Sequence, residues 1–270
     1  MRYGCCLNMI AGSSDKGTGI GFIETLAKAG YDYVELPLAE MTALTDAEFL
    51  ELEGKVKASG IRCEVCNNFF PKTVRLTGDG VDHDGIMAYV ERALKRAQAL
   101  GVEYVVFGSG PAKNVPDGYP LEKGYAQVAE LLRMVDRRLD EYGITVVIEP
   151  LRREECNLIN SFAEGCRLAE DVGGTHIKVL VDYYHMWTEK EPEEHIARDG
   201  KEYLRHVHFA DPNGRVYPKI EEGTSGYRPF FHALQTIGYD GRISCEAYTD
   251  DFGKDAGKAL EFFHEMAARK

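Results

Sequence analysis

One short pattern recurs along this chain and constrains its fold more than any other feature. The end of an amphipathic helix is followed by a glycine and then by a short apolar run. The pattern occurs as KAGYDYVELP (28–37), KASGIRCEVCN (57–67), ALGVEYVVFG (99–108) and EYGITVVIEP (141–150). Glycine is favoured just after a helix because it adopts the left-handed conformation, and apolar β-branched runs favour strands. The pattern therefore predicts strands that alternate with helices.

Eight such strands are predicted, and helical patterns separate them. They lie near residues 3–9, 32–37, 61–67, 103–108, 144–149, 177–182, 204–209 and 242–247. Alternation of this kind predicts a parallel sheet, and the nearly continuous apolar strands indicate burial on both faces. Eight units in 270 residues favour a closed (β/α)8 barrel that forms one domain over residues 1–270. The alternative is an open, doubly wound sheet. Such a sheet usually has a glycine-rich phosphate-binding loop after its first strand, and the glycines after the first predicted strand here do not have the spacing of that loop.

The charge balance bears on partners and location. Acidic residues outnumber basic ones by 44 to 32, which gives a formal net charge of -12. A field of this sign repels nucleic-acid phosphates and anionic membranes, so neither is expected as a partner. The first residues do not have the pattern of a signal peptide, and no apolar run approaches the roughly 20 residues that span a bilayer. We therefore expect a cytoplasmic protein.

Seven cysteines are dispersed along the chain. An odd number in a chain far longer than a disulfide scaffold indicates reduced thiols. Cys63 and Cys66 form a C-x-x-C motif within a predicted strand. Residues three apart in a strand point to opposite faces, so we expect that these two thiols do not share a metal.

Ionisable residues gather where chemistry is expected in a barrel, at the carboxyl ends of the strands. Four successive predicted strands carry one there: Glu149, Asp182, His208 and Glu246. A carboxylate at the end of an apolar strand is costly to bury unless it is paired or binds a metal, and three together would repel one another. Carboxylate oxygens with one imidazole suit Mn²⁺, Mg²⁺ or Co²⁺. These four residues are therefore predicted to bind one divalent ion.

Simpler roles are open to some of these residues. Any one of the acidic residues could merely cap the following helix, but four on successive strands favour a shared site. His206 and His208 lie two apart, so their side chains face the same way. Because only His208 is near enough to the strand end to reach the mouth, it is assigned as the ligand and His206 as a core histidine.

Four motifs carry a resemblance to a known family. They are IEPL (148–151), VDYYHM (181–186), HVHFAD (206–211) and CEAY (245–248). With them the chain resembles the xylose-isomerase-like sugar isomerases and epimerases, and within these the ketose 3-epimerases that act on D-tagatose and D-psicose. The resemblance spans all eight predicted units. It implies a metal-dependent isomerase, with Mn²⁺ the most expected ion and Co²⁺, Mg²⁺ or Zn²⁺ as alternatives, and a homodimer or homotetramer.

The resemblance also implies roles for individual residues. Glu149 and Glu246 match the pair of acid/base carboxylates as well as two of the metal ligands. Glu155 and His185 match residues that contact the sugar. Arg215 matches an arginine of the loop after strand seven, although it lies one residue farther from His208 than the family pattern has it, which implies a rebuilt loop. Asn67, at the end of the third predicted strand, and its neighbour Asn68 are expected to line the substrate pocket.

The chemistry of a ketose agrees with these roles. Its C2 carbonyl and C3 hydroxyl can chelate one metal, which would polarise the carbonyl and stabilise an enediolate. Inversion at C3 needs one group to remove the proton and another, on the opposite face, to return one. Glu149 and Glu246 end different strands and suit that task. No organic cofactor is needed for proton transfer of this kind.

Several alternatives stay open at this point. An aldose–ketose isomerase, a hydroxypyruvate isomerase and an inosose dehydratase or isomerase would share the barrel and the metal. A phosphodiesterase of the apurinic endonuclease type would need histidines at strands three and four, which end in asparagine and in glycine or serine. A barrel that only binds a ligand would not need both glutamates. A phosphate on the sugar would suit the loop 221–229, but two acidic residues there argue against it.

Overall fold

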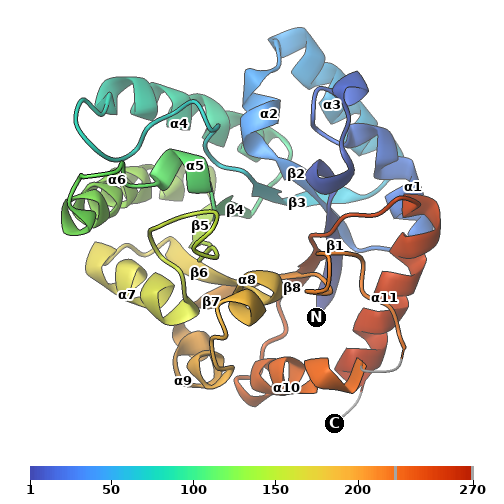
Figure 1. The fold of residues 1–270 in the computed structure, drawn as a ribbon. Coiled ribbons are helices and arrows are strands. Elements are labelled where there is room, and N and C mark those ends of the chain that lie inside the picture. The colour runs from blue at the N-terminus through green and yellow to red at the C-terminus, as the bar shows by residue number, and fades with distance from the viewer. Residues whose placement is uncertain (222–223, 269–270) are drawn as a thin grey trace.

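The structure is a computed structural model that describes residues 1–221 and 224–268. Its eight strands form a closed parallel barrel in which each strand pairs with the next and β8 pairs with β1. Figure 1 shows the strands at the centre of a ring of helices. The strands are β1 Arg2–Cys6, β2 Tyr33–Pro37, β3 Arg62–Asn67, β4 Tyr104–Phe107, β5 Thr145–Ile148, β6 Ile177–Asp182, β7 Leu204–Phe209 and β8 Arg242–Cys245. The predicted (β/α)8 fold is confirmed.

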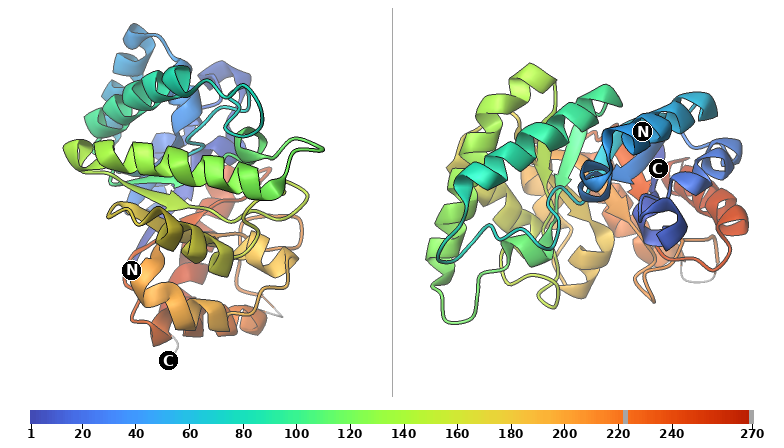
Figure 2. Two further views of the ribbon diagram at one scale, coloured as in Figure 1. Left: turned by 90° about the vertical axis from the view of Figure 1, so that its left-hand side faces the viewer. Right: turned by 90° about the horizontal axis from the view of Figure 1, so that it is seen from above.

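Helices cover the outside of the barrel, as the two side views in Figure 2 also show. Those that connect successive strands are α1 Ile23–Ala29, α3 Asp46–Ser59, α4 His83–Ala99, α6 Leu121–Tyr142, α7 Phe162–Val172, α9 Glu194–Tyr203 and α10 Arg228–Thr236, and α11 Phe252–Ala268 follows the last strand. Shorter helical turns follow several strands: η1 Leu7–Ile10, η2 Ser13–Asp15, η3 Ile20–Phe22, α2 Leu38–Ala43, α5 Gly110–Lys113, α8 Tyr183–Thr188 and η4 Thr224–Tyr227. No helix within the described ranges is both long and apolar enough to pass through a membrane.

Local sequence explains where the helices begin and end. Helix α3 begins after Thr45, whose side chain accepts a hydrogen bond from the backbone of Glu48 while the Glu48 carboxylate accepts one from Thr45. The same helix ends at Gly60 with a φ of 76°, and α6 ends at Gly143 with a φ of 66°. Both glycines take the left-handed conformation that other residues adopt only at a cost. The chain is thereby turned from each helix into the next strand.

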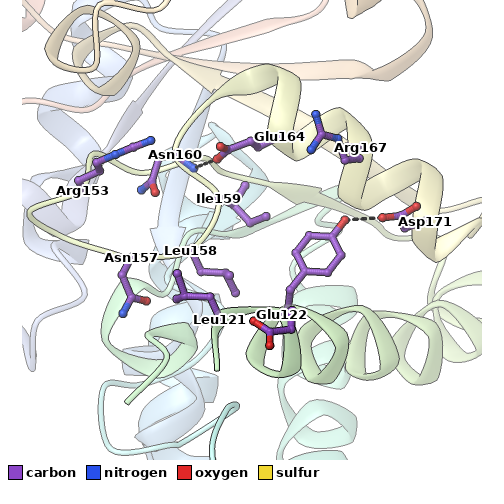
Figure 3. Close-up of a pocket in the computed structure, with 11 residues that line it drawn as sticks. Leu121, Glu122, Arg153, Asn157, Leu158, Ile159, Asn160, Glu164, Arg167 and Asp171 are labelled. Carbon is purple, nitrogen blue, oxygen red and sulfur yellow. Dashed lines mark hydrogen bonds between the residues drawn. The ribbon is translucent and has the colours of Figure 1, made fainter. Parts of the chain in front are cut away.

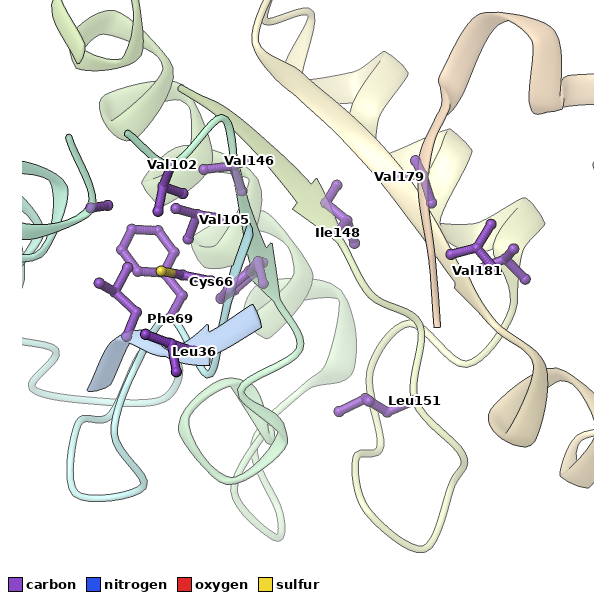
Figure 4. Packing of buried hydrophobic residues seen from close by; sticks show 14 of the residues in the cluster. Leu36, Cys66, Phe69, Val102, Val105, Val146, Ile148, Leu151, Val179 and Val181 are labelled. Atoms are coloured by element: carbon purple, nitrogen blue, oxygen red, sulfur yellow. The ribbon is translucent and has the colours of Figure 1, made fainter. Parts of the chain in front are cut away.

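The hydrophobic core has two layers. The larger layer lies between the strands and the surrounding helices, and Figure 4 shows part of it, including Leu36, Val105 and Val146. The smaller layer fills the inside of the barrel, where Tyr33 and Val65 pack with inward-facing residues of β4, β5 and β6. The barrel is therefore a packed core, and the space for a ligand lies at its mouth.

Strand β1 is shorter than predicted. Its predicted range was 3–9, but pairing with β2 ends at the partners Cys6 and Glu35, and Leu7–Ile10 forms a helical turn. The other neighbour, β8, ends at Cys245, which pairs with Cys5, so the segment after Cys6 satisfies its backbone groups by turning instead. The other strand ranges agree with the prediction to within two residues at either end.

The predicted orientation of Cys63 and Cys66 is wrong. The pairing of β2 with β3 shifts after Val34, which leaves Glu64 as an extra residue in β3. A bulge of this kind breaks the alternation of side chains, and both thiols join the layer between the strands and the helices. Burial, together with Cys63, raises the pKa of Cys66 well above its ordinary value. Neither residue belongs to a metal-capable cluster in the described residues, and the seven cysteines are free, buried thiols.

Candidate functional site

The four predicted ligands come together at the carboxyl ends of the last four strands. Glu149 follows β5, Asp182 ends β6, His208 lies near the end of β7 and Glu246 follows β8. Each offers a ligand atom, and these atoms lie within 4.8 Å of one another. All four side chains are buried. Residues that are far apart in the sequence thus form one compact cluster of three carboxylates and one imidazole.

His208 stands at the centre of this cluster. Its Nδ1 lies 3.2 Å from Glu149 Oε1 and 3.2 Å from Glu246 Oε2. Its other nitrogen, Nε2, lies 2.9 Å from Oε1 of Glu35, a residue of β2 inside the barrel. Burial alone would lower the pKa of His208, but the surrounding carboxylates, Glu35 foremost, raise it well above its ordinary value.

The charges of the carboxylates are only partly balanced by the protein. Burial raises the pKa of Asp182 to about 6 although Arg215 opposes this, and burial also raises the pKa of Glu149. For Glu246, burial is outweighed by His208 and Arg215, which hold its pKa at about 2. Arg215 Nη2 lies 2.7 Å from Glu246 Oε2 and 3.3 Å from Asp182 Oδ2. A divalent cation fits this donor set, because it would supply the missing positive charge and prefers such oxygen and imidazole ligands.

A cavity of about 600 Å³ opens beside the cluster. Its wall includes five of the predicted site residues: Glu149, Glu155, His185, Arg215 and Glu246. Two polar atoms in this wall, Nε2 of His185 and Nε of Arg215, are buried and make no hydrogen bond among the described residues. Because buried polar atoms are normally paired, these two are available to a polar ligand.

Of the two remaining predicted residues, Glu155 and Asn67, only Glu155 lines the cavity. Oε1 of Glu155 accepts a hydrogen bond from Arg152 Nε at 2.7 Å. Asn67 is buried next to the cluster, where its Nδ2 donates to Asn8 Oδ1 at 2.8 Å and to Glu246 Oε1 at 3.4 Å. The neighbouring Asn68, and not Asn67, is part of the cavity wall. In the loop predicted as an alternative phosphate site, 222 and 223 lie outside the described residues.

Sequence reasoning missed two buried charged residues that support the site. Glu35 accepts hydrogen bonds from His208 and His206, and a carboxylate inside the otherwise apolar strand YVELP is the signal that could have revealed it. Lys113 is fully buried, and its Nζ donates to the backbone oxygen of Glu149 at 2.9 Å. Burial lowers the pKa of Lys113. His206 is a core residue, as predicted, and its Nε2 lies 3.0 Å from Glu35 Oε2.

Gly108, directly after β4, has no side chain and so leaves space for the Glu149 carboxylate. A methyl group at this position would overlap Glu149 Oε2. We expect Gly108→Ala to displace that carboxylate and to weaken Mn²⁺ binding about tenfold or more, measured by electron paramagnetic resonance of free Mn²⁺. Gly54→Ala is the matched control, since Gly54 is exposed in α3 and an added methyl meets no atom within 4 Å. Wild-type affinity in Gly108→Ala would contradict the assignment of Glu149 as a ligand.

A second cavity, of about 620 Å³, lies on the outer wall of the barrel between α6, α7 and the loop after β5. Figure 3 shows its lining residues. Several of its polar groups already have partners: the Glu164 carboxylate accepts from the Asn160 backbone at 2.6 Å, and Asp171 accepts from the Tyr125 hydroxyl at 2.6 Å. No metal-capable cluster of the described residues lies in its wall. The cavity at the barrel mouth is therefore the better candidate for catalysis.

Comparison with known proteins places the chain in a family. The profile of the xylose isomerase-like TIM barrel family matches residues 23–266, so the chain belongs to this family. Its relatives include the D-psicose 3-epimerase of Agrobacterium fabrum (strain C58), 28% identical over 252 residues that cover 91% of this chain and 84% of the relative. The L-ribulose 3-epimerase of Methylomonas sp. (strain DH-1) is 27% identical over 265 residues, 88% of each chain. Both relatives are epimerases, which are enzymes of the isomerase class.

Solved structures agree with this placement at the level of the fold. A crystal structure of D-psicose 3-epimerase in the presence of D-fructose has a TM-score of 0.84 to this chain at 23% identity, with all of both chains covered. A D-allulose 3-epimerase from Methylomonas sp. in complex with D-allulose has a TM-score of 0.83 at 22% identity. The predicted resemblance to the family, including its ketose 3-epimerases, is confirmed.

Proposed function

We propose that this protein is a divalent-metal-dependent epimerase that inverts C3 of a ketose. The observation that carries the proposal is the joint position of Glu149 and Glu246. Both carboxylates line the cavity and both lie 3.2 Å from His208 Nδ1, yet they come from strands β5 and β8. Relatives named as ketose 3-epimerases support the same activity. We further propose that residues 1–270 act as one domain.

The metal would be held by Glu149, Asp182, His208 and Glu246. Bound there, a divalent cation would polarise the ketose carbonyl and stabilise the negative charge that develops when C3 loses its proton. Asp182 and His208 serve only as ligands in this proposal. The fit rests on the close approach of the four ligand atoms, their burial and the surplus of negative charge.

Glu149 and Glu246 would move the protons. One carboxylate removes the C3 proton on one face of the substrate, and the other returns a proton on the opposite face, which inverts the centre. Two carboxylates on different strands can reach a substrate from two sides, whereas a single base would return the proton to the face from which it came. No organic cofactor takes part in this transfer.

His185 and Arg215 would hold the sugar. Burial lowers the pKa of His185 to about 4, so its ring is neutral near pH 7. Its Nδ1 accepts a hydrogen bond from the Arg152 backbone at 3.3 Å, which leaves the proton on Nε2 as a donor for a sugar oxygen. Arg215 stacks on Tyr184, with its guanidinium carbon 4.8 Å from the ring centre, and reaches Glu155 at 3.8 Å. Glu155, which lines the cavity, completes the proposed substrate contacts, and Asn67, which lies behind the cavity wall, would act through its hydrogen bond to Glu246.

A panel of small sugars in deuterated solvent tests this function. Free ketoses, ketose phosphates and inososes would each be incubated with the Mn²⁺-loaded protein and analysed by NMR. We expect a free ketose to gain deuterium at C3 and to form its C3 epimer. Formation of an aldose that carries deuterium at C2 would indicate an aldose–ketose isomerase, and reaction only with an inosose would indicate a dehydratase or isomerase of that class. Either result would overturn the proposed epimerisation.

A further inference from the structure

A buried carboxylate inside the barrel connects the metal cluster to the core. Glu35 lies in the middle of β2 and is fully inaccessible to solvent. We propose that Glu35 is a positioning residue that fixes the ring of His208 so that Nδ1, and not Nε2, faces Glu149 and Glu246. The inference rests on the proposed function, because it treats His208 as a metal ligand.

The hydrogen bonds of Glu35 assign the two nitrogens of His208. Oε1 of Glu35 lies 2.9 Å from His208 Nε2. An ionised carboxylate only accepts hydrogen bonds, so Nε2 must carry the proton. With the second proton replaced by a metal, the Nδ1 lone pair then points to the carboxylates 3.2 Å away. A carboxylate behind a ligating histidine orients the ring and makes it a stronger ligand.

Glu35 is itself held in place on its other side. Its Oε2 accepts hydrogen bonds from Ser244 Oγ at 2.6 Å and from His206 Nε2 at 3.0 Å. The hydroxyl of Tyr33 lies 2.8 Å from the same Ser244 oxygen. Because both oxygens accept hydrogen bonds, the Glu35 carboxylate is held in one orientation. The hydrogen bond to His208 then holds the His208 ring in one orientation as well. The arrangement joins β2, β7 and β8 across the inside of the barrel.

A direct metal contact of Glu35 is the competing interpretation. Cys6, Glu35 and His208 form a second group whose ligand atoms lie within 4.8 Å of one another. Two features disfavour it. Both oxygens of Glu35 are already used by donors, and all three residues are fully buried and do not line the cavity at the barrel mouth. Cys6 Sγ approaches His208 Nε2 only to 3.8 Å.

Glu64 provides a matched control for the loss of a buried charge. It is as buried as Glu35 and also lies inside the barrel, but its partners are Arg2 at 2.6 Å and Arg242 at 2.6 Å. None of the four proposed metal ligands contacts it among the described ion pairs and hydrogen bonds. Glu64→Gln should therefore lower the stability of the fold without acting on His208.

The test is the dissociation constant of Mn²⁺ for wild-type protein and three variants, measured by electron paramagnetic resonance, with thermal unfolding as a check of the fold. We expect Glu35→Gln to weaken Mn²⁺ binding about 10- to 100-fold. Glu64→Gln and Cys6→Ala should bind as the wild type does. If Glu35→Gln does not fold, Glu35→Asp, which draws the carboxylate back by one methylene, should still weaken binding by more than about threefold.

Four other outcomes of these measurements would each overturn the inference. Equal affinity of wild type and Glu35→Gln would overturn the positioning role while leaving the proposed function intact. A loss in Cys6→Ala as large as that in Glu35→Gln would make Glu35 a direct ligand and overturn the inference in favour of the second group. A similar loss of Mn²⁺ affinity in Glu64→Gln would show that the loss in Glu35→Gln comes from general destabilisation of the fold, which would overturn the positioning role. Failure of the wild-type protein to bind Mn²⁺ would overturn the inference and the proposed function together.

Discussion

Replacement of either Glu149 or Glu246 by glutamine is expected to abolish exchange of the substrate C3 proton with solvent. A carboxamide keeps the shape of the side chain but is not a base at neutral pH. General acid–base catalysis contributes about 10²- to 10⁴-fold to a rate, and each variant also removes a metal ligand, so the loss should reach at least the upper part of this range. The measurement is deuterium incorporation at C3 of a reactive ketose, followed by NMR.

Glu154→Gln is the matched control for these two variants. Glu154 lies in the loop after β5, near Glu149, but its side chain is 68% exposed and is not part of the cavity wall. This variant should keep the wild-type rate of exchange. If Glu149→Gln or Glu246→Gln retained most of that rate, the mechanism with two carboxylates would be wrong.

Removal of divalent ions with a chelator is expected to eliminate activity and to lower the unfolding temperature. Three buried carboxylates would then lie together with the positive charges of His208 and Arg215 close to them but without the two charges of the ion. Addition of Mn²⁺ or Co²⁺ should restore both properties. A free ion concentration of about 100 times the dissociation constant should raise the free energy of unfolding by about 2.7 kcal/mol. Full activity in protein shown by elemental analysis to be metal-free would contradict the account.

The stabilisation by metal should also depend on pH. Folded Asp182 holds its proton up to a pKa of about 6, whereas its ordinary value is 3.8. The unfolded chain therefore binds fewer protons between these values, and Asp182 lowers the stability of the metal-free protein as the pH rises through them. Because the metal replaces this proton, the gain in unfolding temperature with Mn²⁺ should be larger near pH 8 than near pH 5. A larger gain near pH 5 would argue against Asp182 as a ligand.

The sequence was sufficient to predict the barrel and the meeting of the four ligands. Eight alternating units leave few ways to bury apolar strands on both faces, and the carboxyl ends of parallel strands share one edge. Position at a strand end therefore predicts proximity, even for Glu149 and Glu246, which are 97 positions apart in the chain. The roles of these residues stay proposals, because proximity does not by itself identify the ion or the substrate.

Features that depend on register and on neighbouring side chains could not be predicted in the same way. The extra residue Glu64 reverses the alternation in β3, and a pattern of apolar residues does not locate such a bulge. Glu35 resembles any acidic residue until its contacts with His208 and Ser244 are known. Both Asn67 and Asn68 were expected to line the cavity, and that only Asn68 does so depends likewise on how the chain leaves β3.

Arg215 illustrates a prediction that relied on family resemblance alone. It lies one residue farther from His208 than the family pattern has it, yet its guanidinium still reaches Glu246 and Asp182. The backbone at Arg215 has a φ of 53°, a left-handed conformation that is uncommon outside glycine. The unusual turn brings the side chain back to the cluster, and sequence spacing could not have indicated it.

The most direct test of the central claim is an anomalous difference map from crystals of the protein soaked in Mn²⁺ and measured near the manganese absorption edge. We expect one strong peak at the barrel mouth, within bonding distance of Glu149, Asp182, His208 Nδ1 and Glu246. A peak between Cys6, Glu35 and His208 Nε2, or none at the barrel mouth in protein that is active with Mn²⁺, would contradict it.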